Sequence, residues 1–278
     1  METAITAERP NGASTSEPLL ALRGVHKRFG AVQALDDVNF DVQAGEVVGL
    51  VGDNGAGKST LVKTISGIYK PDQGKFSFDG KPVSITGPQE AAALGIATVY
   101  QDLALCDNLD VVSNLFLGSE MVSHGPQSFV RALDETTMEH RAHELLSNLA
   151  VSIPNVRTEV GTLSGGQRQQ VAVARSMLGE PKVVLLDEPT AALGVAQTAQ
   201  VLALIKRLRE NGIGVVVISH NLGDVFEVAD RIFVLRLGTG AGDFQTASTS
   251  RDEIVAAITG SSANGDGSAA PSAPGGSE

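Results

Sequence analysis

Residues 47–60 read VVGLVGDNGAGKST and decide the fold of this chain. The apolar run Val47–Val51 is typical of a buried strand; a glycine-rich turn follows it, and a helical stretch runs from Lys58 to about Gly67. Gly52–Ser59 therefore matches the pattern G-x-x-x-x-G-K-[ST] in the setting that a phosphate-binding loop requires, after a strand and at the start of a helix. A glycine turn without function is the alternative, but it does not account for both flanking elements.

Each part of this loop has an expected role toward a nucleotide. The glycines let the backbone curl, so that successive N–H groups point at phosphate oxygens. Lys58 supplies a positive charge to the β- and γ-phosphates, Ser59 offers a hydroxyl to Mg²⁺, and Thr60 can contact the α-phosphate. The sequence thus predicts a nucleotide site formed by Gly52, Asp53, Asn54, Gly55, Ala56, Gly57, Lys58, Ser59 and Thr60.

A second phosphate-binding surface is predicted at Leu163–Gln167, which reads LSGGQ. Ser164 offers a hydroxyl, and the adjacent Gly165 and Gly166 expose backbone N–H groups. The helical run Gln169–Leu178 follows directly and adds the positive end of its dipole. Because no internal repeat is visible, one nucleotide loop is accompanied by two phosphate-binding surfaces. The sharpest explanation is that the second surface serves a nucleotide held by another copy of the domain.

Two acidic residues form a third motif. Val183–Leu186 is a run of four apolar residues, so Asp187 falls at the exposed end of a buried parallel strand, where ligands of open α/β sheets bind. There Asp187 can hold Mg²⁺, usually through water. Glu188 is placed to accept a proton from an attacking water as a general base. A solvated strand end or a helix cap is the alternative, but Pro189 and Thr190 mark an abrupt exit from the strand.

Short apolar strands alternate with helical stretches through most of the chain, which predicts an α/β fold. Strands of buried, parallel type are expected at 47–51, 96–100, 183–187 and 215–219, and antiparallel strands at 19–25, 38–42 and 75–78. Strand signals vanish between about 110 and 150, where Leu109–Phe116 and Thr137–Leu149 have a helical pattern. We therefore expect a mainly parallel core sheet with helices, an antiparallel β subdomain, and an inserted α-helical subdomain at about 103–178.

The two ends of the chain have a different composition. Residues 1–18 are rich in Ala, Thr, Ser, Glu and Pro without periodicity, and residues 261–278 contain no aromatic or long aliphatic side chain. Such segments cannot offset the entropy of folding by burying apolar surface. We expect a disordered arm at 1–18, a folded domain at 19–260, and a disordered tail at 261–278.

Composition also limits the class of protein. The chain has 278 residues, of which 42% are hydrophobic, and so is long enough to bury a core. Its net charge of -11 argues against broad nucleic-acid binding, which needs basic patches. Without an apolar run near the ~18 residues that span a bilayer, and without an apolar signal region, the protein is expected in the cytosol. Cys106 is the only cysteine, which excludes an internal disulfide.

The three motifs, in this order, resemble those of the ATP-binding cassette (ABC) family of transport ATPases, and the similarity covers about residues 19–260. LSGGQ carries most of it, because five fixed residues rarely coincide by chance. The resemblance implies a P-loop NTPase fold of ABC type and Mg²⁺-dependent hydrolysis of ATP by two cassettes paired head to tail. Each ATP would lie between the lysine loop of one subunit and Ser164–Gln167 of the other. The Ser164 hydroxyl and the Gly166 N–H would meet the γ-phosphate of the partner's ATP.

Further positions match the family one at a time. Phe29 sits where the family has an aromatic residue that stacks on adenine, although a core role would be an equal interpretation of Phe29 alone. Gln101 matches the glutamine that links Mg²⁺ and the attacking water to the membrane partner; taken singly it is a surface amide. His220 matches the switch histidine that contacts the γ-phosphate and Glu188, although a lone histidine at a strand end is more often structural.

One residue departs from the family pattern. Gly194 stands where the family usually has an aspartate that helps to couple the two nucleotide sites across the dimer. Its absence puts the detail of that coupling in doubt. The lysine, Mg²⁺ and general-base positions are intact, so we expect hydrolysis to survive.

Several stretches look like the ATPases of bacterial simple-sugar importers of the ribose, xylose and fructose type. They are Gly80–Val83, Gly95–Gly118, Thr190–Thr198 and Arg251–Gly260. Many members of that group fuse two cassettes, whereas this chain has one. The resemblance implies a homodimer at the cytoplasmic face of the cell membrane, under two polytopic permease subunits that an extracellular sugar-binding protein supplies, and no nucleic-acid partner.

Several other functions are alternatives to sugar import. An importer ATPase for another small solute fits the same motifs. A non-transport ABC ATPase acting on DNA would need long coiled-coil insertions with heptads, and one acting on ribosomes usually has two cassettes and basic linkers. LSGGQ and its following helix argue against a solitary P-loop kinase or GTPase. Neighbouring genes for a permease and a sugar-binding protein would discriminate between these functions.

Overall fold

The structure is a computed structural model that describes residues 17–123 and 132–261. The predicted disordered arm and tail lie outside the described residues, apart from residues 17, 18 and 261. Among the described residues, no helix is both long and apolar enough to cross a bilayer.

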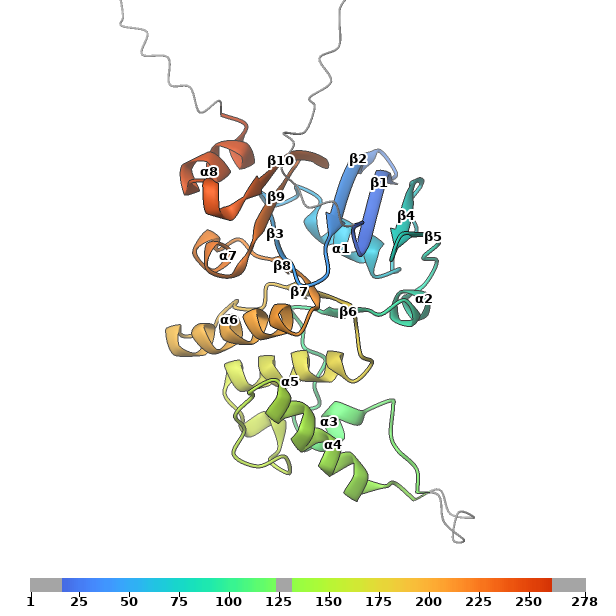
Figure 1. Ribbon diagram of the computed structural model, residues 1–278, viewed down its shortest axis with the longest axis vertical. Coiled ribbons are helices and arrows are strands. Elements are labelled where there is room, and N and C mark those ends of the chain that lie inside the picture. Colours follow the sequence, from blue (N-terminus) through green and yellow to red (C-terminus); the bar gives the residue numbers. More distant parts are fainter. Residues whose placement is uncertain (1–16, 124–131, 262–278) are drawn as a thin grey trace, which may run out of the picture.

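A six-stranded sheet forms the centre of the molecule, with the strand order β10-β9-β3-β8-β7-β6 (Figure 1). Its strands are β3 (Val47–Val51), β6 (Ile96–Val99), β7 (Val183–Asp187), β8 (Gly214–Ile218), β9 (Arg231–Arg236) and β10 (Thr239–Gln245). All neighbours are parallel except β9 and β10, which are antiparallel. β3 and β8 are buried along their whole length, as expected for strands covered on both faces. The predicted, mainly parallel core sheet is confirmed.

A second, antiparallel sheet has the order β2-β1-β4-β5. Its strands are β1 (Leu20–Phe29), β2 (Val32–Val42), β4 (Gln73–Phe78) and β5 (Lys81–Val83). Helix α1 (Lys58–Ile65) is packed between the two sheets, because Leu61 and Ile65 share one core with Phe40 of β2 and Leu50 of β3. This sheet confirms the predicted antiparallel part of the fold.

Helices cover the opposite side of the core sheet. Figure 1 shows α6 (Val195–Glu210) against the sheet, α5 (Gly165–Met177) beside it, and α3 (Val111–Phe116) and α4 (Glu135–Asn148) beyond α5. The remaining elements are α2 (Pro88–Ala93), α7 (Leu222–Val228), α8 (Arg251–Thr259) and the 3₁₀ helices η1 (Val160–Thr162) and η2 (Thr246–Ser248). α3, α4 and α5 fall within the predicted subdomain at about 103–178, whose boundaries remain a prediction.

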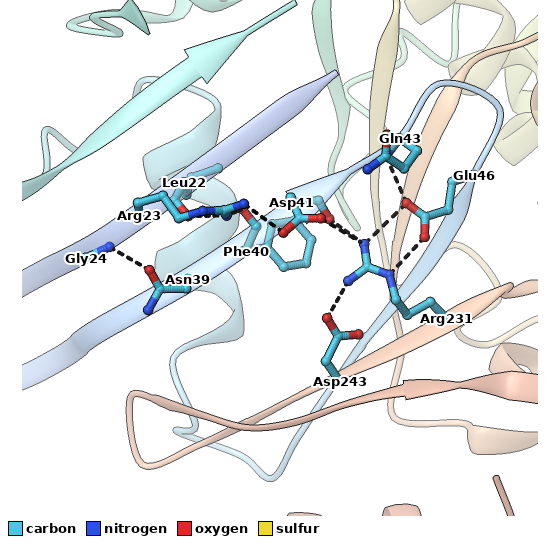
Figure 2. Close-up of polar contacts among 10 residues, drawn as sticks. All are labelled: Leu22, Arg23, Gly24, Asn39, Phe40, Asp41, Gln43, Glu46, Arg231 and Asp243. Carbon is cyan, nitrogen blue, oxygen red and sulfur yellow. Dashed lines mark hydrogen bonds and ion pairs between the residues drawn. The ribbon is translucent and has the colours of Figure 1, made fainter. Parts of the chain in front are cut away.

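Arg231 links the two sheets through a charged cluster, which Figure 2 shows. Its Nε donates to Glu46 Oε1 at 2.8 Å, its Nη1 to Asp243 Oδ2 at 2.7 Å, and its Nη2 to the Asp41 carbonyl oxygen at 2.7 Å. The Arg231 side chain is only 8% exposed. Burial raises the pKa of Asp243, and the Arg231 guanidinium opposes that shift. One guanidinium therefore joins β9, β10, β2 and the turn before β3.

We expect Arg231→Met to lower the free energy of unfolding by about 3–5 kcal/mol, because it removes a buried guanidinium from the partly buried carboxylates of Glu46 and Asp243. Arg157→Met is the matched control. Arg157 also contacts three carboxylates but is 36% exposed, so its loss should cost about 0–1 kcal/mol. Denaturant unfolding measures both values. Equal losses in the two variants would contradict a special role for Arg231.

Candidate active site

The phosphate loop connects β3 to α1, as predicted, and its backbone requires glycine. Gly57 has φ 105°, and a Cβ there would lie 2.6 Å from the Ala34 carbonyl oxygen. A Cβ on Gly52 would collide with the Leu235 carbonyl oxygen at the end of β9. The Gly238 N–H donates to the Ala56 carbonyl oxygen at 2.9 Å, so the turn between β9 and β10 supports the loop from behind. The loop is thus fixed in a curled conformation.

Lys58 lies against the loop that it would serve. Its Nζ donates to the Gly52 carbonyl oxygen at 2.7 Å and to the Asp53 carbonyl oxygen at 3.0 Å. Burial lowers the pKa of Lys58, and the charges of Glu188, Asp53 and Asp187 oppose that shift. The ammonium is therefore held beside the loop by contacts that phosphate oxygens can replace.

The other residues of the loop keep their polar groups accessible. Asp53, Asn54, Gly55 and Ser59 are exposed, Thr60 is half-buried, and Ala56 is buried. The exposed Ser59 hydroxyl follows Lys58 at the start of α1 and is accessible to a ligand of the loop. The predicted members thus form one continuous segment, which consists of the loop and the first residues of α1.

Two acidic side chains lie where β7 ends, next to β8. Asp187 is the last residue of β7, and burial raises its pKa, with a further increase from the charge of Glu188. Glu188 has φ 51°, a left-handed conformation that is rare outside glycine and is retained where the surroundings enforce it. Its N–H donates to the Ile218 carbonyl oxygen at 2.9 Å, which ties it to the end of β8.

His220 contacts the predicted general base directly. Its Nδ1 lies 2.8 Å from Glu188 Oε2. The Glu188 side chain is 17% exposed and the His220 side chain 74% exposed, so one is sheltered and the other is open to a ligand. Gln101, also exposed, follows β6, which pairs with β7. The carboxyl ends of three neighbouring strands therefore bring Gln101, Asp187, Glu188 and His220 to the same edge as Lys58.

Phe29 ends β1 and is 42% exposed, so its ring is accessible to a stacking partner. Tyr69 holds the ring edge-on, with centroids 5.0 Å apart, and Lys27 Nζ lies 5.3 Å from the Phe29 centroid. Tyr69 was not among the predicted site residues. Nothing in the sequence around Tyr69 indicates that its ring contacts Phe29.

The LSGGQ segment forms the start of α5. The Gln167 N–H donates to Ser164 Oγ at 3.3 Å, and the Ser164 N–H donates to Gln167 Oε1 at 3.0 Å, which together make a capping box. Since Ser164 Oγ accepts in this pair, its own O–H can still donate to an anion. Gly166 must be glycine, because a Cβ there would lie 2.8 Å from Gln197 Cβ.

The structure brings together only part of the predicted site. Lys58, Asp187, Glu188 and His220 lie close enough to influence one another. Ser164–Gln167 belongs to a different region, since α5 lies across the core sheet from α1 (Figure 1). The predicted second phosphate-binding surface is thus separate from the loop of its own chain.

The residues present fit Mg²⁺ bound together with a nucleotide. Within the described residues, no group of three or more His, Cys, Asp or Glu side chains could hold a metal by itself. Mg²⁺ usually takes one or two protein ligands and completes its shell with phosphate oxygens and water. Ser59, Asp187 and Gln101 offer a hydroxyl, a carboxylate and an amide oxygen of that kind.

Together the fold and the site define an ATP-binding cassette. Comparison with known proteins leads to the same class. The model of the ABC transporter family matches residues 35–191. The fructose import ATP-binding protein FrcA of Rhizobium meliloti is 47% identical over 88% of this chain and 95% of its own length. The xylose/arabinose import ATP-binding protein XylG of Sulfolobus acidocaldarius is 46% identical over 87% and 94%. The chain therefore belongs to the ABC transporter family and is an ATPase.

Solved structures of ATP-binding cassettes have the same fold as this chain. The ADP conformation of MJ1267, an ATP-binding cassette of an ABC transporter, superimposes with a TM-score of 0.75 at 27% identity and covers 88% of this chain and 96% of its own. The dimeric structure of MJ0796, a bacterial ABC transporter cassette, gives a TM-score of 0.67 at 26% identity, over 82% and 98%. The predicted cassette fold is confirmed.

We expect Asp187→Asn to raise the melting temperature of the nucleotide-free protein at pH 7 by about 1–3 °C. Asp187 has a raised pKa in the folded protein, so the wild type loses stability as the pH rises from the ordinary pKa of the carboxyl through the raised one. The variant lacks this loss. The difference should therefore shrink as the pH is lowered through that window, as thermal unfolding at a series of pH values can show. A lower melting temperature for the variant at pH 7 would contradict the account.

Proposed function

We propose that this chain is the ATP-hydrolysing subunit of an importer that takes up a monosaccharide through a membrane permease. The observation that carries the proposal is the match to the fructose and xylose/arabinose import proteins along nearly their whole length. A ribose import ATP-binding protein, RbsA 1 of Rubrobacter xylanophilus, is also 43% identical, although this chain spans 48% of it. These relatives are named for different sugars. The proposal therefore names monosaccharides as the substrate class and no individual sugar.

The working unit that we propose is a homodimer with two shared ATP sites. Ser164–Gln167 lies away from the loop of its own chain, and a related cassette forms a dimer. In the proposed dimer, the Ser164 hydroxyl and the N–H groups at the start of α5 face the γ-phosphate held by the partner. Each site then takes the lysine loop from one subunit and the LSGGQ segment from the other.

The residues of the phosphate loop and of the adjacent strand ends have different roles in the proposed hydrolysis. Phe29 stacks on the base, and Lys58 and the N–H groups of Gly52–Thr60 bind the phosphates. When Mg²⁺ is bound, at Ser59, Asp187 and Gln101, it neutralises phosphate charge. Glu188 takes a proton from a water whose oxygen attacks the γ-phosphorus, while the bond to the ADP oxygen breaks. His220 holds Glu188 and faces the γ-phosphate.

The permease partner would dock beside Gln101. An apolar cavity of about 470 Å³ lies there, lined by residues that include Ile68, Ala91 and Tyr100. Tyr100 directly precedes Gln101, and its hydroxyl donates to Ser66 Oγ at 3.0 Å. A side chain of the permease seated in this cavity would thus press on the segment that reaches the nucleotide. In this arrangement the protein lies at the cytoplasmic face of the membrane, and an extracellular sugar-binding protein delivers the sugar.

The test is ATPase activity of the chain reconstituted with the permease and binding protein encoded beside it. We expect a monosaccharide to stimulate hydrolysis, and Glu188→Gln to lower the stimulated rate by at least ~10²-fold while ATP still binds, because a general base contributes on this scale. Stimulation by a solute other than a sugar would contradict the proposed substrate class. A normal rate in Glu188→Gln would contradict the role of Glu188.

A further inference from the structure

Phe29, the residue proposed to stack on the base, is held in place by two side chains. Its ring forms a T-shaped pair with Tyr69, with centroids 5.0 Å apart and ring planes at 69° to each other. Lys27 Nζ lies over the Phe29 ring, 5.3 Å from the centroid. Phe29 nevertheless remains 42% exposed. The protein therefore fixes one part of the ring and leaves another part open to a base.

The Tyr69–Asp72 segment, which lies between α1 and β4, also ties down the end of β1 that carries Phe29. Asp72 Oδ2 accepts the Arg28 N–H at 2.7 Å, and Asp72 Oδ1 accepts from Lys27 Nζ at 3.0 Å. The Asp72 N–H in turn donates to a backbone carbonyl oxygen of β1 at 2.9 Å. Because these contacts hold the two residues directly before Phe29, its ring cannot turn away unless they break.

The same segment is fastened to α1, the helix that begins at the phosphate loop. The Tyr69 N–H donates to the Lys63 carbonyl oxygen at 3.0 Å, and Lys63 Nζ lies 5.6 Å from the Tyr69 centroid. Burial raises the pKa of Asp187, and the charge of Lys63 opposes that shift, so Lys63 lies close to the candidate site. One short helix thus connects the phosphate loop at its start with Tyr69 after its end, and through Tyr69 with Phe29.

A fixed separation between the phosphate loop and Phe29 matters for affinity. A nucleotide that is bound at both places gains most when the two places are already held at the correct distance. If the Phe29 ring were free to move, the nucleotide would have to order it on binding, and that loss of entropy would reduce the affinity. The contacts of Tyr69 and Asp72 order the ring before any ligand binds.

We propose that Tyr69 and Asp72 are positioning residues for nucleotide binding: they hold Phe29 at a fixed place relative to the phosphate loop, so that the base and the phosphates of one nucleotide bind together. This inference rests on the proposed function, in which Phe29 stacks on the base. It adds two residues that act on the nucleotide only through Phe29. Their loss should therefore weaken the part of the affinity that comes from the base and leave the part that comes from the phosphates.

The first test compares the affinities for ADP and for pyrophosphate, each with Mg²⁺, by titration calorimetry. Pyrophosphate has the two phosphates of ADP without the base. We expect Tyr69→Leu to weaken ADP binding about fivefold, the scale of one aromatic pair, and to leave pyrophosphate binding unchanged. Asp72→Ala should act in the same direction. Tyr69→Phe keeps the ring and should keep the affinity, and Asp252→Ala, which removes an exposed carboxylate on α8, is the control for Asp72→Ala.

Two results would overturn the proposal. One is an ADP affinity that stays at the wild-type value in Tyr69→Leu and in Asp72→Ala. The other is an equal loss for ADP and pyrophosphate in these variants, because the effect would then not depend on the base.

The second test shows whether Tyr69 acts through Phe29. Phe29→Ala should weaken ADP binding roughly tenfold, as the loss of base stacking does elsewhere. Adding Tyr69→Leu to Phe29→Ala should weaken it no further, because the ring that Tyr69 positions is gone. A further fivefold loss in the double variant would overturn the proposal. If the wild-type protein binds neither ADP nor pyrophosphate, the proposed function fails and the inference with it. A wild type that binds ADP more tightly than pyrophosphate, with unaffected variants, overturns the inference alone.

Discussion

The constraint on which this molecule depends is that parallel strands end at the same edge of a sheet. β3, β8, β7 and β6 are neighbours, and each is followed within two residues by a residue or loop to which we assign a role in the proposed chemistry. These groups are Gly52 and its loop after β3, His220 after β8, Glu188 after β7 and Gln101 after β6. The strands are buried and their register is fixed by packing, so the exits cannot shift relative to one another. The buried sheet therefore fixes the relative positions of the predicted site residues.

Charged side chains are partly buried and close together at this edge. Asp187 is partly buried beside Glu188, and the two carboxylates repel each other, while Lys58 is desolvated beside them. In the proposed function, a nucleotide with Mg²⁺ would bring a cation to the carboxylates and phosphate oxygens to the lysine. The pKa shifts of Asp187 and Lys58 are of the kind that a nucleotide with Mg²⁺ would relieve, which supports the proposed role in ATP binding.

The sequence predicts this edge well because its signals are local. The apolar runs of β3 and β7 give their bounds to the residue, and a glycine turn or an Asp-Glu pair follows directly. β9 was not predicted, because the charged residues Arg231 and Arg236 flank its apolar residues. Arg231 is nevertheless buried, and ion pairs with residues far away in the sequence compensate its charge.

Contacts between distant residues could not be predicted at all. The Thr190–Asp224 hydrogen bond and the packing of Gln197 on Gly166 join segments that are far apart in the chain. Nothing in their residue types distinguishes them from a solvated threonine or glutamine. LSGGQ indicated a partner subunit because it is a second phosphate-binding surface in a chain with one nucleotide loop, and the structure adds that the segment lies apart from that loop.

The central claim is that each ATP site is shared between two chains, and mixing two inactive variants tests it most directly. Lys58→Ala removes the lysine of a site, and Ser164→Asp places a carboxylate at the γ-phosphate while keeping a good helix cap. In a mixed dimer both defects fall in one site and the other site is intact. The account predicts that the mixture recovers ATPase activity, to about a quarter of the wild-type rate if the sites act independently. A mixture as inactive as each variant alone would contradict it.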